Sequence, residues 1–263
     1  ALPGDVHVEE YRLLAIDVSS CQIQDAHYRR IPSVRNAWGF FNAQIGWWAN
    51  DSRRTYFIDQ TRGDQVLRLV EFNTHTGATR ILFEETSETH INISADSESY
   101  PTHMPLPDSN ELIWWSERSG WAHIYLYDLD TGELKNTITQ GDWLVRDVCH
   151  FDAKRREVFI QTAGRVEGRD PYYRDICRVQ VDTGELTTVL STDDEYVVHV
   201  QKSLLFQIAE GSIGWDIGKK TAGVSPCGDY IVTTRSRIDQ VPVSLLLDRE
   251  GTLVCELETA DIS

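Results

Sequence analysis

Ser225 is the residue closest to a recognisable catalytic motif, the Gly-x-Ser-x-Gly elbow that exposes the nucleophile of a serine hydrolase. Residues 223–228 read GVSPCG, so Cys227 stands where the elbow needs its second glycine. Pro226 follows the serine directly, and this residue type favours a turn over a strand-to-helix elbow. We interpret Ser225 as a turn residue, so the chain has no predicted catalytic residue.

The other candidate chemistry would come from histidine and cysteine, and neither type shows a ligand spacing. No HExxH string occurs, no two cysteines form a CxxC pair, and the histidines are scattered. We therefore predict no metal site and no cofactor, and we interpret His75 in a turn and His123 in a strand as structural. The eight histidines are His7, His27, His75, His90, His103, His123, His150 and His199.

The odd number of cysteines predicts reduced thiols that are mostly buried, a pattern that leans towards the cytoplasm. No apolar run is long enough to span a membrane, and the chain begins with ALPG in place of a signal peptide or a Met. The five cysteines are Cys21, Cys149, Cys177, Cys227 and Cys255.

A formal net charge of −16 opposes binding to nucleic acid or to an anionic membrane surface, because both need clustered Lys and Arg. The simplest role of this charge is solubility, and the alternative is attraction of a cationic ligand such as the amino terminus of a peptide. Eight Trp, ten Tyr and eight Phe suit packing between strands, whereas the single Met argues against a helical bundle.

Internal repetition shows which elements must position any site. Residues 124–139 (IYLYDLDTGELKNTIT) and 176–191 (ICRVQVDTGELTTVLS) are two alternating strands around a turn, and 66–83 and 243–257 repeat the unit. The turn glycines are Gly77, Gly132, Gly184 and Gly251, spaced by 55, 52 and 67 residues.

A second hairpin precedes each of these units. Its turns begin near residues 50, 107, 152 and 226, and the strands TYFID, LIWWS, EVFIQ and YIVTT follow them. Each repeat thus holds four strands, A to D, the content of one β-propeller blade. The predicted fold is all-β, with blades over 40–86, 87–140, 141–192 and 193–259, and with 1–39 as the tail of an earlier blade plus a loop.

Two stretches interrupt the regular turns, and loops of this kind often make contacts. Residues 165–174 (RVEGRDPYYR) lengthen the B–C connection of the third blade, and about 201–222 are inserted within or before strand A of the last. Arg165, Arg169 and Arg174 flank DPYY, so we expect them to anchor that loop through carboxylates, with contact to a substrate or another domain as the alternative.

Two tryptophan pairs, Trp47-Trp48 and Trp114-Trp115, fall inside predicted strands. Side chains alternate between the two faces of a strand, so we expect one ring of each pair to face the core. Ligand stacking is the alternative role for these rings.

Three strings together resemble a known family. LIWWSERSGWAHIYLYD (112–128), ITQGDWLVRDV (138–148) and GRDPYYRDICRV (168–179) are similar to the propeller of the dipeptidyl peptidase IV group of prolyl oligopeptidase-like serine peptidases. The likeness covers about 44–259. It implies an eight-bladed propeller that caps an α/β-hydrolase domain, which supplies a Ser-Asp-His triad and releases dipeptides from peptide amino termini, with Pro or Ala preferred in second position.

The chain departs from this pattern in the residues that act on substrate. The family's paired-glutamate motif, which grips the amino terminus of the substrate, has no match, because Glu9-Glu10 and Glu84-Glu85 lack its aromatic and acidic context. The leading hypothesis is therefore the later, non-catalytic blades of such a peptidase, which shape and gate the way to an absent hydrolase domain. The alternative is a stand-alone propeller, five-bladed in one version, that binds a protein or ligand.

The resemblance also bears on partners. It implies the hydrolase domain of the parent protein and a peptide substrate. A partial ring should in addition form homo-oligomers through its open ends, the Val6–Val18 strand at one end and Leu245, Leu247 and Leu257 at the other. A closed five-bladed ring would stay monomeric.

Overall fold

The computed structural model of the chain describes residues 5–32, 45–95, 102–198 and 223–261, with the backbone of 204–209 and 212–217. These residues form strands and turns, with no helix among them. The strands are β1 (Glu10–Tyr11), β2 (Leu14–Ile16), β3 (Ile23–Asp25), β4 (Ile31–Pro32), β5 (Gly46–Trp48), β6 (Arg54–Gln60), β7 (Val66–Asn73), β8 (Thr79–Thr86), β9 (His103–Leu106), β10 (Glu111–Ser116), β11 (His123–Asp128), β12 (Leu134–Thr137), β13 (Leu144–Asp152), β14 (Glu157–Ala163), β15 (Arg174–Gln180), β16 (Leu186–Leu190), β17 (Glu195–Val198), β18 (Leu204–Ala209), β19 (Ser212–Ile217), β20 (Tyr230–Arg237), β21 (Gln240–Asp248) and β22 (Leu253–Thr259).

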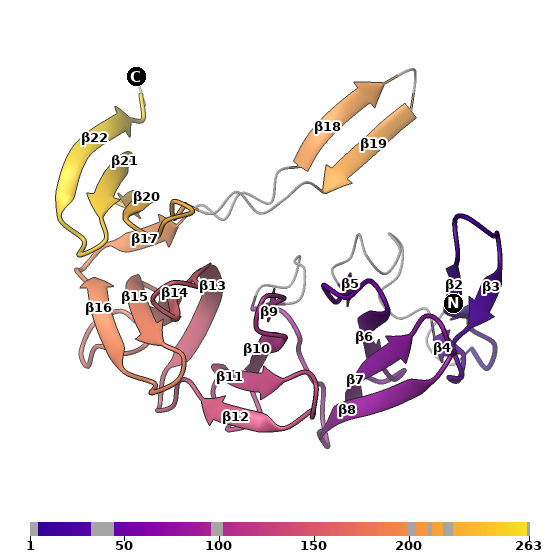
Figure 1. Ribbon diagram of the computed structural model, residues 1–263. Helices are drawn as coiled ribbons and strands as arrows, with labels where there is room; N and C mark the ends of the chain where they lie inside the picture. The colour runs from indigo at the N-terminus through magenta and orange to yellow at the C-terminus, as the bar shows by residue number, and fades with distance from the viewer. Residues whose placement is uncertain are drawn as a thin grey trace. The chain divides into compact units, whose positions relative to one another are not determined.

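Four sheets of four strands form the body of the fold, as predicted (Figure 1). Their strand orders are β5-β6-β7-β8, β9-β10-β11-β12, β13-β14-β15-β16 and β17-β20-β21-β22. All the pairings described in these sheets are antiparallel. Each sheet is thus a propeller blade with strands A to D, and the all-β prediction is confirmed. The blade boundaries given above stay a prediction.

The B strands β6, β10 and β14 are buried on both faces, which explains their nearly continuous apolar sequence. In β10 all six residues are buried, and the exposed fractions of Trp114 and Trp115 are 2% and 3%. The expectation that alternation would send only one ring inward was therefore wrong for this pair. Alternation does place the two rings on opposite faces, but both faces are covered. In β5 the pair differs, because Trp47 is half-buried and Trp48 is 50% exposed.

The insertion in the last blade interrupts strand A, whose two parts both pair with β20. Strand β17 pairs directly with β20, and the β18–β19 hairpin occupies part of the intervening chain. After the insertion Val224 bridges Ile231 of the same strand β20, so the chain returns to the ladder that it left at Val198 opposite Thr233. The expected position, within or before strand A, is therefore confirmed, because the insertion lies within this strand.

The C–D turns share one hydrogen-bonding scheme. The side-chain oxygen of the first turn residue accepts bonds from two backbone N–H groups, as Asp128 does from Asp130 and Thr131 at 2.8 Å each. Equivalent acceptors are Asn73, Gln180 and Asp248. A glycine with positive φ follows, which explains the Thr-Gly signature in the sequence.

Gly132 also allows close contact with the preceding blade. Its φ is +81°, and a Cβ built there would lie 2.5 Å from the carbonyl oxygen of Leu82 in β8. Gly251 repeats this arrangement, because its Cβ would lie 2.1 Å from the carbonyl oxygen of Val189 in β16. The turn glycine is therefore needed for its backbone conformation and for packing of one blade on the next.

We expect Gly132→Ala to destabilise the chain by about 2–3 kcal/mol, of which about 1–2 kcal/mol is the strain of a left-handed alanine. Gly63→Ala is the matched control, since Gly63 has a φ of +94° and nothing within 4 Å of its Cβ position. Urea denaturation of both variants measures the difference. Equal losses would show that the contact with Leu82 contributes nothing.

The β2–β3 hairpin near the N-terminus has the same turn. Asp17 Oδ1 accepts from the N–H groups of Ser19 and Ser20, and Cys21 stands at the positive-φ position with φ 56°. A Cβ on Gly77 of the next blade would lie 2.5 Å from the carbonyl oxygen of Asp25 in β3, the same relation that the later blades show. This geometry supports the interpretation of residues 1–39 as the tail of an earlier blade, which stays a prediction.

The chain divides into two compact units, residues 1–118 with 126–135 and residues 119–125 with 136–263. In the first unit Ala26, Ile31, Phe57, Val70 and Phe72 form one buried cluster. A larger cluster in the second unit joins the third and fourth sheets, and its members are Cys149, Phe159, Ile176, Val189, Tyr196, Val198, Val224, Ile231, Leu245 and Leu247.

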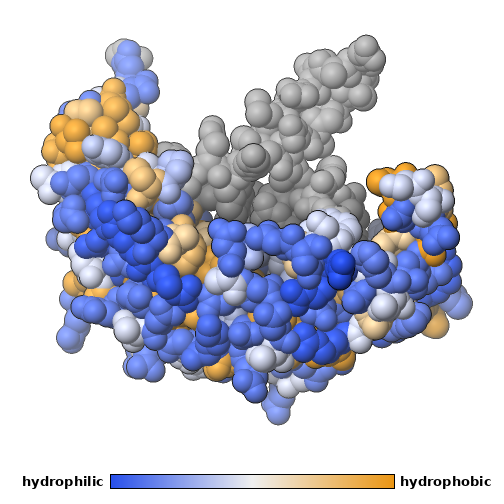
Figure 2. Space-filling model, in the orientation of Figure 1, coloured by the Kyte–Doolittle hydropathy of each residue, from blue (hydrophilic) through white to orange (hydrophobic). Residues whose placement is uncertain are grey.

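This second cluster corrects two expectations. Leu245 and Leu247 are 5% and 2% exposed, so they belong to the core and not to an open end, because their strand β21 is the third of four. The outer strand β22 of this sheet does expose apolar side chains, those of Leu253, Val254 and Leu257, where Figure 2 shows an orange surface. The thiols are not mostly buried either: Cys149 and Cys177 are buried, whereas Cys21, Cys227 and Cys255 are exposed in turns or on the outer strand.

Candidate functional site

The long B–C connection of the third blade, residues 164–173 between β14 and β15, is held by arginine. Arg169 is nearly buried, and its Nη2 lies 2.6 Å from Oδ1 of the fully buried Asp175. Its Nη1 donates to Ser191 Oγ at 2.9 Å and to the carbonyl oxygen of Thr192 at 2.8 Å. A single guanidinium therefore joins the loop, strand C and the chain that follows strand D.

The other two predicted arginines complete this anchor. Arg165 donates to Thr188 Oγ1 at 2.7 Å and lies 5.8 Å from the centre of the Trp143 ring, while Arg174 forms an ion pair with Glu195. The carboxylates are those of Asp175 and Glu195, not that of Asp170 within the loop, which instead accepts from the Tyr172 N–H at 2.9 Å. The prediction that arginines anchor the loop is confirmed, with these partners.

A hollow of about 550 Å³ lies beside the loop. One end of the third sheet builds most of it, through the starts of strands A and C and the end of B, and Glu195 at the start of strand A of the fourth sheet completes it. Pro171 and Tyr172 stand at its exposed rim, and the Tyr172 side chain is 85% exposed. The lining residues are Leu144, Arg146, Ala163, Pro171, Tyr172, Tyr173, Arg174 and Glu195.

A second hollow, of about 370 Å³, lies in the other unit. It is more polar and includes Glu84, Glu85, Ser116, Glu117 and Arg118. Glu84 Oε2 lies 2.6 Å from Arg68 Nε, and Glu85 is paired with Arg118. Both carboxylates are therefore already neutralised, and we assign no role to Glu84 and Glu85. Partial burial raises the pKa of Glu117, and the nearby His90 acts in the opposite direction.

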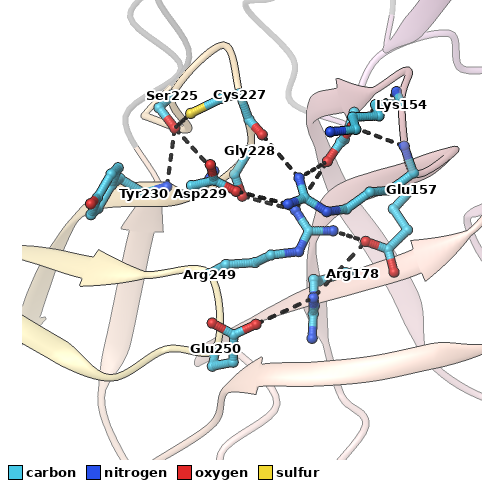
Figure 3. A network of polar contacts seen from close by, with 12 residues as sticks. Lys154, Glu157, Arg178, Ser225, Cys227, Gly228, Asp229, Tyr230, Arg249 and Glu250 are labelled. Carbon is cyan, nitrogen blue, oxygen red and sulfur yellow. Dashed lines mark hydrogen bonds and ion pairs between the residues drawn. The ribbon is translucent and has the colours of Figure 1, made fainter.

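Ser225 occupies a turn, as the sequence indicated (Figure 3). Its Oγ accepts from the backbone N–H groups of Asp229 at 3.2 Å and Tyr230 at 3.0 Å, and lies 3.3 Å from the Cys227 sulfur. These contacts close the turn before strand β20. Among the described residues, the Ser225 Oγ has no hydrogen bond to a general base, which a nucleophilic serine needs.

A buried guanidinium lies close to this turn and was not predicted. Arg249 follows β21, and its Nη1 donates to the carbonyl oxygen of Gly228 at 2.8 Å and lies 3.2 Å from Asp152 Oδ2 (Figure 3). Its Nη2 pairs with Glu157, and its central carbon lies 5.2 Å from the Phe159 ring centre. The sequence DREG shows only a turn, so nothing in it indicates that this arginine is buried.

His75 and His123 lie in a turn and in strand β11, as expected. The His123 imidazole is buried, with Nε2 2.9 Å from the Gly141 carbonyl oxygen and Nδ1 3.0 Å from Thr139 Oγ1. Burial lowers its pKa. Among the described residues no group of three or more His, Cys, Asp or Glu is arranged to hold a metal ion, and no helix has the length and hydropathy for crossing a membrane.

These sheets and their arginine-anchored loop define the class: a β-propeller segment of four-stranded blades. The family described as the dipeptidyl peptidase IV (DPP IV) N-terminal region matches residues 35–208, more than half of the chain. The chain therefore belongs to this family.

Individual relatives are similar over shorter stretches. Dipeptidyl peptidase 4 of Trichophyton equinum is 32% identical over 76 residues, which is 29% of this chain and 9% of that protein. Dipeptidyl peptidase 4 of Trichophyton rubrum is 40% identical over 45 residues, which is 17% of this chain and 6% of that protein. The chain thus covers only a small part of these relatives.

Two solved structures share the fold. The dipeptidyl peptidase 4 of Porphyromonas gingivalis superposes with a TM-score of 0.66 at 16% identity, over 94% of this chain and 29% of that one. A protein described as a dipeptidyl aminopeptidase IV from Bacteroides ovatus gives a TM-score of 0.64 at 17% identity, over 97% of this chain and 37% of that one.

Proposed function

We propose that the chain is the non-catalytic propeller portion of a dipeptidyl peptidase IV-like serine exopeptidase. In this role it would shape and gate the chamber through which peptides reach an α/β-hydrolase domain of the parent protein. The match of residues 35–208 to the DPP IV N-terminal family carries the proposal.

The loop geometry supports this role. In a four-stranded antiparallel meander the B–C and D–A connections lie at the same end of the sheet. The anchored loop at 164–173 and the hollow beside it both lie at this end of the third blade. A rigid loop at one rim is suited to contact a neighbouring domain or a passing peptide.

The chain alone should not hydrolyse glycyl-prolyl p-nitroanilide, because Ser225 closes a turn and the described residues offer no triad around it. The purified 263-residue chain and its Ser225→Ala variant are compared in a chromogenic assay. Turnover that the Ser225→Ala change removes would contradict the non-catalytic role.

The reading frame beyond residue 263 tests whether the parent protein has a hydrolase domain. A Gly-Trp-Ser-Tyr-Gly-Gly elbow about 100–200 residues further on, with the Asp and His of a triad after it, is the expected result. A reading frame without an elbow would favour a stand-alone binding scaffold. Expression of the whole frame, with its elbow serine replaced by alanine as control, then tests for release of dipeptides.

A further inference from the structure

Arg146 is the bulged residue of strand β13. The pairing of β13 with β14 runs Val145 to Thr162 and then Asp147 to Gln161, so Arg146 has no partner across the ladder. A β-bulge of this kind redirects a side chain, and bulges are over-represented beside functional sites.

The redirected side chain borders the hollow beside the anchored loop. Arg146 is exposed and makes no hydrogen bond or ion pair with any residue that the structure describes. In contrast, Arg165, Arg169 and Arg174, which serve the adjoining loop, all have carboxylate partners. The positive charge of Arg146 is thus available to a ligand in a chain whose net charge is −16.

The rest of the lining defines what would accompany that charge. Leu144 and Ala163 offer apolar surface, and Pro171 with Tyr172 forms an exposed wall held by the arginine anchor. A guanidinium binds a carboxylate through two parallel hydrogen bonds, and a tyrosine ring packs against apolar or aromatic groups. Arg174 and Glu195 also line the hollow, but they form an ion pair with each other. The hollow therefore combines the guanidinium of Arg146 with this ion pair and an apolar wall.

We propose that this hollow binds a peptide carboxylate, with Arg146 pairing the carboxylate and Tyr172 packing on the neighbouring side chain. The carboxylate is supplied either by an Asp or Glu side chain or by a peptide carboxyl terminus. The inference rests on the proposed function in one respect, that the ligand is a peptide. The binding itself is a property of this chain and needs no hydrolase domain.

Three fluorescein-labelled hexapeptides test the proposal by fluorescence anisotropy on the whole 263-residue chain. The first has a tyrosine next to a glutamate and an amidated end, the second replaces the glutamate with glutamine, and the third is the glutamine peptide with a free carboxyl terminus. We expect the first or the third to bind about five- to tenfold more tightly than the second, because hydrogen bonds to charged groups are the stronger ones. Which of the two gains identifies the source of the carboxylate.

Variants assign this preference to Arg146. Arg146→Gln should remove it, Arg146→Lys should restore part of it, and Tyr172→Ala should weaken all three peptides while keeping their ratio. Arg53→Gln, at an exposed arginine in the first A–B turn, is the matched control and should change nothing. Raising the salt concentration should reduce the preference, because screening weakens exposed charge pairs.

Two results would overturn the proposal: equal binding or no binding of all three peptides at millimolar protein, or a carboxylate preference that survives Arg146→Gln. Neither result touches the assignment to a peptidase, which depends on the reading frame. Conversely, a reading frame without a hydrolase elbow would leave the carboxylate preference in place.

Discussion

Replacing either Trp114 or Trp115 with alanine should lower the free energy of unfolding by about 3–5 kcal/mol, as truncation of a buried tryptophan does. Both side chains are almost inaccessible in β10. The Trp114 ring is packed between two other rings: its centre lies 5.2 Å from that of Phe83, which is edge-on, and 5.9 Å from that of His103. Its Nε1 donates to Glu85 Oε2 at 3.5 Å.

Urea denaturation followed by tryptophan fluorescence and by circular dichroism measures this loss. Trp121→Ala is the matched control, because this ring is 41% exposed and its loss should cost about 1 kcal/mol. Trp114→Phe should recover part of the loss by refilling the space between Phe83 and His103. A mild effect at only one position of the pair would show that one face of β10 is open.

The sequence predicted the strands because their signals are local. Alternation and the Asp-Thr-Gly turns located β11–β12 and β15–β16. In each turn one side-chain oxygen, of Asp128 or Gln180, accepts from two N–H groups and glycine supplies the positive φ. The B strands appeared as TYFID, LIWWS, EVFIQ and YIVTT, and the structure extends each of them by one to three residues.

Contacts between blades could not be predicted in the same way. Whether both faces of β10 are covered depends on chain elements distant in sequence, so alternation alone misjudged Trp114 and Trp115. The bulge at Arg146 leaves no mark in WLVRDV, because one extra residue in a ladder changes pairing and not composition. In the sequence Arg249 looks like any polar turn residue. Its partner Asp152 is 97 positions earlier, so only the folded chain shows that the two side chains are paired.

This arginine is the second position where we expect a large effect: Arg249→Met should destabilise the chain by about 3–5 kcal/mol, the usual result of breaking a buried ion pair on one side. The side chains of Arg249 and Asp152 are 8% and 5% exposed, and Glu157 lies against the other guanidinium nitrogen. Removal of the guanidinium would leave two carboxylates without this partner and free the Gly228 carbonyl. The stability of Arg249→Lys should lie between those of the parent and Arg249→Met, because an ammonium group keeps the charge but cannot reproduce the planar geometry of the guanidinium.

Two comparisons separate this effect from loss of packing. Arg12→Met breaks the exposed pair with Asp25, whose side chains are 55% and 50% exposed, and should cost less than about 1 kcal/mol. The triple variant Asp152→Asn, Glu157→Gln, Arg249→Met removes both sides of the buried cluster and should recover much of the loss.

The pH dependence gives an independent test of the same cluster. Burial alone would raise the pKa of Asp152, but hydrogen bonds from Arg155 and the charges of Arg155 and Arg249 hold it below its ordinary 3.8. A carboxyl whose folded pKa is lowered contributes stability above its unfolded pKa and loses it as the pH falls through the folded value. Without Arg249 the folded pKa of Asp152 rises, so this carboxyl is protonated at a higher pH in the variant than in the parent. Protonation removes the buried charge that has lost its Arg249 partner and that destabilises the variant. The stability difference between the parent and Arg249→Met should therefore be largest at neutral pH and should narrow below about pH 4. A difference that stays constant from pH 7 to pH 3 would mean that Arg249 acts through packing on Phe159 and not through its charge.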